Sequence, residues 1–253
     1  MNPTKFSLPI QQALTSAPLD FVFLSGNGSY QINKILASTQ CITIKNLLIC
    51  DPSCNSYKVT TADTHGSFQD VLEFLNGNMI SLNSTNIEFI RQVAVELQCS
   101  KLSDFVAPTI ISNMSPSIAI QTLNKYLQQN ITPASYIQMC QYELRYVAKN
   151  FENIKHSYLP ELSRLPIEAL DVILMVPELN VEETDILDFV YSIIEQNPNN
   201  PAYYSLFSHV LYDKIESDRA RTFFDKIKTQ EVSGALWLAM SRRLKCHVVS
   251  DNI

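Results

Sequence analysis

The sequence has no apolar run long enough to span a membrane. A transmembrane helix needs about 18 or more consecutive apolar residues. The most hydrophobic segment, residues 169–181, is interrupted by Asp171, Pro177 and Glu178. The opening residues, MNPTKFSLPIQQAL, also have no sustained apolar segment after their lysine. We therefore expect no membrane span, no secretory signal and no membrane partner.

The sequence also lacks an excess of positive charge. Its formal net charge is -6, whereas a protein that binds nucleic acid needs cations to contact the phosphates. The densest basic group lies in residues 242–247, where cations suit the C-terminal end of a helix. We therefore expect no nucleic-acid partner.

Cysteines are present, but not at the spacing of a metal site. The chain has six, and none forms a C-x-x-C pair. Cys50 and Cys54 have no second pair of Cys or His at zinc-ligand spacing after them. This pattern is typical of reduced, mostly buried thiols, and it predicts a cytoplasmic or nuclear protein without a metal.

Catalytic motifs are absent as well. The chain contains no G-x-S-x-G elbow, no Walker loop and no G-x-G-x-x-G. His65 lies near Asp63, but we expect this aspartate to cap the next helix rather than to form an acid–base pair. The acidic residues of 182–185 fit the first turn of a helix better than a metal cluster. The sequence therefore predicts no catalytic residues, no cofactor and no enzyme activity.

The first part of the chain mixes short strands and helices. Residues 20–24 and 29–32 have the composition of strands, and the glycines of 26–28 suit a tight turn between them. Asn33 is a good N-cap for the helix that follows. Further strands are predicted at 57–60 and 79–82, and helices at 44–49, 67–75, 87–97 and 101–106.

The second part of the chain is predicted to be entirely helical. Ser115 and Thr132 each place a capping hydroxyl before a proline, and each opens a helix of roughly four turns. Residues 197–201 form a turn or linker. The remaining predicted helices cover 158–165, 166–175, 182–197, 202–212, 216–228 and 234–244.

The motifs of the first part resemble those of the BTB/POZ domain. In that family an Asp-Val-x-Phe strand is followed by Phe-x-x-His-Lys and Leu-Ala. Here the corresponding residues are 20–23, Tyr30 to Lys34, and Leu36-Ala37, with Asn33 in place of the histidine. Phe68 and residues 74–77 resemble the family's later helix, and residues 94–97 its late Ala-x-x-Leu. The resemblance covers residues 18–107.

The second part resembles a divergent BACK domain, the helical region that often follows BTB. Residues 162–194 resemble its core, and the whole region covers 114–247. The two resemblances together imply an α+β fold, in which a BTB/POZ-like domain of short strands covered by helices precedes an all-α BACK-like domain.

The resemblance implies a protein-binding role. BTB–BACK proteins commonly dock onto a cullin scaffold and bring substrates to a ubiquitin ligase. Members that do so often carry a hydrophobic-any-Glu pattern after the second short helix, which resembles Ile49-Cys50-Asp51 here. The alternative is that Ile49 belongs to the core and Asp51 only ends a helix before Pro52. Exposure of Ile49 would favour an adaptor, and burial would oppose it.

A second hypothesis is a self-associating scaffold with no role in a ubiquitin ligase. BTB homodimers place an aspartate of the first strand and a basic residue of the next helix in a charged pocket, and Asp20 and Lys34 are the matching residues. An ordinary ion pair within the domain would explain them equally. Many BTB domains form dimers through a longer helix before this aspartate than the present sequence offers. A third hypothesis is a regulator of an unrelated enzyme.

Overall fold

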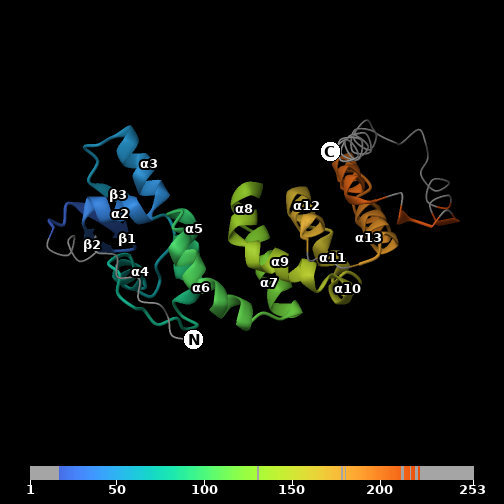
Figure 1. The fold of residues 1–253 in the computed structure, drawn as a ribbon, viewed down its shortest axis with the longest axis horizontal. Coiled ribbons are helices and arrows are strands. Elements are labelled where there is room, and N and C mark those ends of the chain that lie inside the picture. The colour runs from blue at the N-terminus through green and yellow to red at the C-terminus, as the bar shows by residue number, and fades with distance from the viewer. Residues whose placement is uncertain are drawn as a thin grey trace, which may run out of the picture. The chain divides into compact units, whose positions relative to one another are not determined.

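The chain folds into two compact units. The computed structural model describes residues 17–211, except 130, 178 and 180, together with 214–216, 218, 219 and 222. Over these residues the fold is α+β, with many helices and a small three-stranded sheet (Figure 1). The chain divides between Asn113 and Met114, into unit 1 before this point and unit 2 after it. None of the described helices is both long and apolar enough to cross a membrane.

Unit 1 contains the sheet. Strand β1 (Phe21–Ser25) lies in the centre and pairs antiparallel with β2 (Gly28–Ile32) and parallel with β3 (Ser56–Lys58). The predicted hairpin is therefore present. Gly26 has a φ of 55°, the left-handed conformation that favours glycine at a tight turn.

Helices and strands of unit 1 enclose one aromatic-rich core. Phe23 of β1 and Phe68 are both fully buried, and their ring centroids lie 5.3 Å apart. Asn33 accepts hydrogen bonds from the backbone N–H groups of Ile35 and Leu36, which confirms the predicted N-cap. The helices are α2 (Lys34–Gln40), α3 (Ile42–Cys50), α4 (Phe68–Leu75), α5 (Ile87–Glu96) and α6 (Ser100–Ser112).

One prediction for unit 1 is wrong, and one predicted helix is too short. Residues 79–82 do not form a strand. Ile80 and Leu82 do pack against the core, so the alternating pattern indicates burial correctly although the segment pairs with no strand. The predicted helix 101–106 continues to Ser112 with Pro108 inside it. The helix tolerates this proline because residues on both sides of it, Val106 and Ile110, pack against the core.

The described part of unit 2 is helical, as predicted. The side chains of Ser115 and Thr132 accept hydrogen bonds from backbone N–H groups of the first turn, and a proline follows each of them, which confirms both caps. The helices are α7 (Pro116–Leu127), α8 (Pro133–Met139), α9 (Gln141–Lys149), α10 (Phe151–Ile154), α11 (Leu159–Leu162), α12 (Ile167–Met175), α13 (Glu183–Gln196) and the 3-10 helix η1 (Pro201–His209).

Several boundaries in unit 2 differ from the predictions. The helix predicted from Thr132 breaks at Cys140, between α8 and α9. The segment predicted as a helix over 202–212 is mostly the 3-10 helix η1. The predicted helix 234–244 lies outside the described residues, as does most of the one predicted for 216–228.

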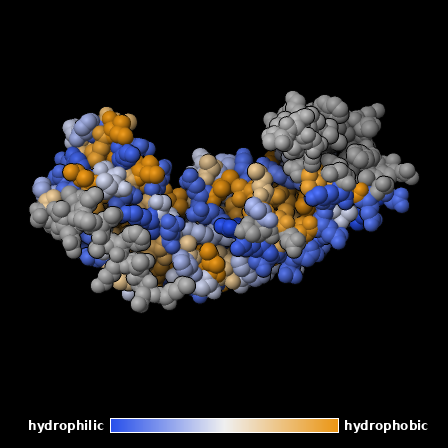
Figure 2. Space-filling model, in the orientation of Figure 1, coloured by the Kyte–Doolittle hydropathy of each residue, from blue (hydrophilic) through white to orange (hydrophobic). Residues whose placement is uncertain are grey.

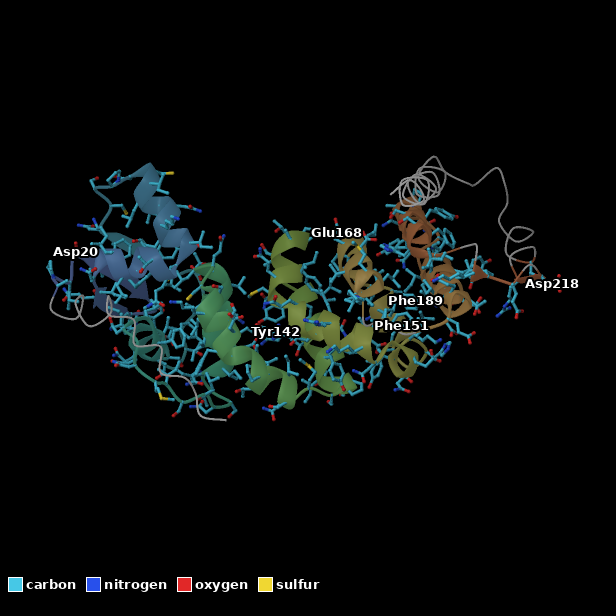
Figure 3. All side chains as sticks on the ribbon, viewed as in Figure 1. Asp20, Tyr142, Phe151, Glu168, Phe189 and Asp218 are labelled. Carbon is cyan, nitrogen blue, oxygen red and sulfur yellow. The ribbon has the colours of Figure 1, made fainter. Side chains whose placement is uncertain are left out.

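The core of unit 2 joins helices that are distant in sequence. Phe151 of α10 and Phe189 of α13 meet edge to face, with their ring centroids 4.8 Å apart (Figure 3). Both side chains are buried. Such a pair adds to the free energy gained from burial alone.

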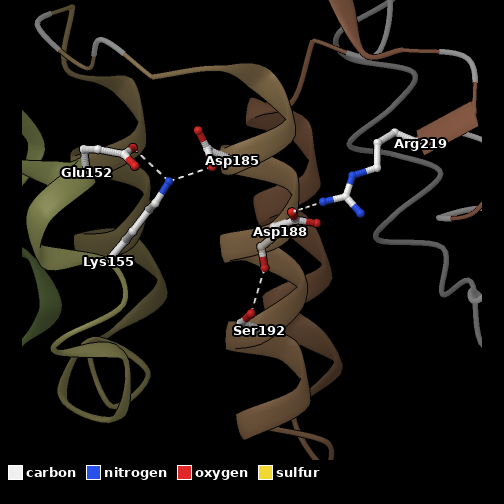
Figure 4. Close-up of polar contacts among 6 residues, drawn as sticks. All are labelled: Glu152, Lys155, Asp185, Asp188, Ser192 and Arg219. Atoms are coloured by element: carbon white, nitrogen blue, oxygen red, sulfur yellow. Dashed lines mark hydrogen bonds and ion pairs between the residues drawn. The ribbon is translucent and has the colours of Figure 1, made fainter.

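Lys155, which follows Phe151 closely in the sequence, is a buried lysine. Its side chain is only 2% exposed, and the Nζ of Lys155 lies 2.8 Å from the Oε2 of Glu152 and 2.7 Å from the Oδ1 of Asp185 (Figure 4). Burial opposes the charged form of Lys155, but the hydrogen bonds to the two carboxylates outweigh it and raise its pKa. Arg219 and Asp188 form a further pair at 2.8 Å, but both are more than half exposed, so this contact contributes little to stability.

The buried charge predicts an asymmetric response to mutation. Glu152 and Asp185 are 61% and 36% exposed, so water can solvate them if the lysine is removed. Replacing both carboxylates with alanine leaves the ammonium group buried without a counter-ion, and we expect a loss of about 3 kcal/mol in the free energy of unfolding. Lys155→Met should change it by less than about 1 kcal/mol. Urea denaturation of both variants tests this, and equal losses would contradict it.

Candidate protein-interaction surface

Helix α3 exposes a stripe of side chains that includes two isoleucines. Its exposed residues recur at intervals of three and four, as expected for one face of a helix. Ile49 is 69% exposed and Ile42, two turns earlier, is also exposed. Figure 2 shows apolar residues gathered over the α3 end of unit 1. The α3 surface is defined here as Ile42, Lys45, Asn46, Ile49 and Cys50.

The opposite side of α3 attaches the helix to unit 1. Ile44 is fully buried, and Leu47 and Leu48 pack against the core while remaining partly exposed. The helix therefore directs isoleucines both into the core and toward solvent. Exposure of Ile42 and Ile49 is a consequence of this arrangement, because the core-facing positions are already filled by other residues.

The start of α3 is hydrogen-bonded to the end of α5. The backbone N–H of Thr43 donates to the carbonyl oxygen of Leu97 at 3.3 Å. The Thr43 hydroxyl donates to the carbonyl oxygen of Glu96 at 2.8 Å. These two bonds satisfy polar groups that a helix end otherwise leaves unpaired, and they fix the position of the first turn of α3.

The side chain of Glu96 also holds the segment that follows β3. Its Oε1 accepts from the backbone N–H of Thr60 at 2.6 Å, and its Oε2 accepts from the backbone N–H and the hydroxyl of Thr61 at 2.9 and 2.7 Å. The hydroxyl of Tyr57 donates to Oε1 at 3.2 Å. One residue thus connects α5 with the β3 segment through charge-assisted hydrogen bonds of its side chain, and with α3 through its backbone carbonyl.

Asp51 ends α3, as one of the two sequence interpretations proposed. Its Oδ1 accepts from the hydroxyl of Ser53 at 2.6 Å and from the backbone N–H of Ser53 at 3.0 Å. These bonds lower the pKa of the Asp51 carboxyl, and the charge of Lys34 contributes in the same direction. The companion idea that Ile49 belongs to the core is wrong, because Ile49 is exposed.

Asp20 and Lys34 lie in contact. The Oδ1 of Asp20 accepts a hydrogen bond from the backbone N–H of Lys34 at 2.7 Å, at the first residue of α2. The Nζ of Lys34 reaches the carbonyl oxygen of Pro52 at 3.4 Å. The sequence-predicted residues Asp20, Lys34 and Asp51 are therefore connected around the loop after α3, and Ile49 lies two residues before that loop.

Other apolar residues near these positions were not predicted from the sequence. Leu19 and Ile35 are exposed, and each is the direct neighbour in sequence of Asp20 or Lys34. Ile42 was also missed, although its seven-residue spacing from Ile49 could have indicated a shared helix face. The α2 site is defined here as Leu19, Asp20, Lys34 and Ile35.

The positions considered for catalysis have structural partners. Asp63 accepts hydrogen bonds from the backbone N–H groups of Ser67 and Phe68 at 2.8 and 3.0 Å, which confirms that it caps the start of α4. The ring of His65 bonds to the hydroxyl of Thr64. Within the described part of the chain, no cluster of three or more Asp, Glu, His or Cys side chains could hold a metal ion.

Comparison with known proteins does not assign this surface a role. No protein-family model matches the chain, and the search of curated proteins finds no match. The geometry of unit 1 and the motifs in its sequence are therefore the features that bear on function.

The bond between Tyr57 and Glu96 predicts a pH dependence of stability. Burial and the neighbouring Glu96 raise the pKa of Tyr57 from 10.0 to about 12. In the unfolded chain Tyr57 ionises at its ordinary pKa, so its contribution to stability is complete below that value and is lost as the pH rises toward the folded-state value.

We expect the stability difference between wild type and Tyr57→Phe to shrink across this alkaline range, with a limiting slope of about 1.4 kcal/mol per pH unit. Urea unfolding at a series of pH values measures it. The phenylalanine variant is the control, because it keeps the ring and every other tyrosine. Parallel curves for the two proteins would show that folding does not raise the pKa of Tyr57.

Proposed function

We propose that unit 1 is a BTB/POZ-like interaction domain and that the protein is an adaptor that recruits partners to a cullin-based ubiquitin ligase. The order of short strands and helices in unit 1 supports this proposal, as does the helical unit 2 that follows as a BACK-like region. The sequence motifs that resemble BTB contribute buried residues such as Phe21, Phe23 and Phe68 to one core.

The observation that carries the proposal is the exposure of Ile49. An apolar side chain surrounded by polar groups is the kind of residue that dominates binding energy when a partner covers it. On the α3 surface, Lys45, Asn46 and the following Asp51 provide these polar neighbours. Ile49 lies in the last turn of α3, and the resemblance assigns the cullin contact to the pattern just after this helix.

The proposal places the protein in the cytoplasm or nucleus, where its cysteines stay reduced. Its partners are proteins, and it needs neither a cofactor nor a membrane.

Substitution at Ile49 should strongly reduce cullin recovery. We expect tagged wild-type protein to capture a cullin from a lysate of its native cells, identified by mass spectrometry. Ile49→Asp places a charge in the contact and should reduce capture by about tenfold or more. Met175→Asp is a matched control, because Met175 is 70% exposed but lies on α12 of unit 2. No cullin with either protein, although both are folded, would refute the adaptor.

The α2 site supports a second candidate function, a self-associating scaffold. Two exposed apolar residues, Leu19 and Ile35, flank the contact between Asp20 and Lys34. A symmetric contact needs such a self-complementary patch, in which apolar and charged groups lie together. The α3 surface would then be free for another partner.

Sedimentation over a range of concentrations tests the scaffold. If the α2 site mediates self-association, wild type should dimerise as concentration rises, and Ile35→Asp should weaken the dimer by about tenfold or more. Met79→Asp is the control, since Met79 is highly exposed in the loop after α4. A wild-type protein that stays monomeric at every concentration would exclude this candidate.

A further inference from the structure

Two buried cysteines lie at helix junctions of unit 1. Cys41 is the residue between α2 and α3, and Cys99 precedes α6 directly. Both side chains are fully buried in the same hydrophobic core. Cysteine is common in cores as a small apolar residue, so burial alone would call for no further role.

The backbone brings these two junctions together. Thr43, two residues after Cys41, donates its N–H to the carbonyl oxygen of Leu97, two residues before Cys99. The Thr43 hydroxyl bonds to the carbonyl oxygen of Glu96 in the same region. Two segments that are distant in sequence are therefore held side by side at the positions that carry the thiols.

Each of the two thiols also affects the titration of the other. The Cys99 side chain, together with burial, raises the pKa of Cys41. The Cys41 side chain lowers the pKa of Cys99, although burial acts in the opposite direction. Cys99 is thus the better nucleophile of the pair, since the thiolate is the reactive form.

We propose that Cys41 and Cys99 form an intramolecular disulfide when the protein is exposed to hydrogen peroxide or an organic hydroperoxide. The Cys99 thiolate attacks one peroxide oxygen, which gives a sulfenic acid and releases hydroxide, or alkoxide from an organic hydroperoxide. The Cys41 sulfur then attacks the sulfenic sulfur, the S–S bond forms and water leaves. Overall, two thiols lose two electrons and two protons, and one peroxide is reduced to two waters, or to water and an alcohol.

The other described cysteines are less suited to this reaction. Cys50 is exposed on the α3 surface, and the thiol of Cys54 donates to the carbonyl oxygen of Ser56. Cys140 is buried in unit 2. The Cys41 and Cys99 pair therefore combines an adjacent partner with a difference in thiol reactivity.

The disulfide would restrain the helix that carries the α3 surface. It would add a covalent link to the two hydrogen bonds that Thr43 makes at the start of α3. Formation of the bond does not depend on the proposed adaptor function, so failure of either proposal leaves the other standing. Because both thiols are buried, peroxide must enter while the junction is open, and the reaction should be slower than oxidation of Cys50.

Peptide mapping of the wild-type full-length protein tests the proposal. After treatment with hydrogen peroxide, the remaining thiols are alkylated in denaturant and the protein is digested with trypsin. The cleavage pattern places Cys41 in peptide 35–45, Cys99 in 92–101, and Cys50 with Cys54 in 46–58. We expect a peptide of 35–45 linked to 92–101, lighter than the two separate peptides by two hydrogen atoms, and released by reductant.

Two variants and the gel pattern sharpen the test. Cys41→Ala should abolish the link and leave Cys99 as a thiol or as its sulfenic or sulfinic acid, whereas Cys140→Ala should retain the link. The linked protein should migrate as a monomer on a non-reducing gel. Full alkylation of 35–45 and 92–101 after Cys50 has been oxidised would overturn the proposal, and so would a link of Cys99 to Cys50 or to a second molecule. The wild-type mapping decides the matter even if a variant fails to fold.

Discussion

The arrangement of unit 1 depends on one carboxylate. Glu96 lies at the end of α5, and its side chain accepts hydrogen bonds from Tyr57, Thr60 and Thr61 while its backbone carbonyl accepts from Thr43. Glu96 thus contacts the segment after β3 and the start of α3 from its place at the end of α5. Hydrogen bonds to an ionised acceptor are stronger than neutral ones, so Glu96 is held firmly in position. Its backbone carbonyl therefore gives the start of α3 a fixed base.

A fixed base matters because the proposed contact is small. The α3 surface offers two isoleucines and a few polar groups, and a surface of this size gains affinity only when little free energy is spent on ordering it. Restraint of α3 at both ends, by Thr43 at its start and by the Asp51 turn at its end, meets this requirement. The disulfide proposed between Cys41 and Cys99 would act on the same restraint.

Local chemistry could be predicted from the sequence, and distant partners could not. The caps Asn33, Ser115 and Thr132 act on N–H groups within the next few residues, so their side-chain types were sufficient. The contacts of Glu96 join it to residues more than thirty positions away, and nothing local marks it. Alternation over 79–82 indicated which side chains are buried but could not show that a neighbouring strand is missing. The break at Cys140 and the extension of α6 past Pro108 are likewise decided by packing, which overrides propensity.

Of the candidate site, the residues around Asp20 and Ile49 were found from motifs, whereas the exposed apolar neighbours Leu19, Ile35 and Ile42 required the structure.

The lysine buried in unit 2 affects how that unit opens locally. Lys155 is shielded from water by the same packing that brings Asp185 of α13 to it. If α13 detached alone, Lys155 would lose one counter-ion, and the buried edge-to-face contact of Phe151 with Phe189 would open at the same time. Detachment of α13 therefore breaks both contacts in one step. We expect α10 and α13 to exchange their amide protons as one cooperative unit, with a shared opening free energy rather than two separate ones.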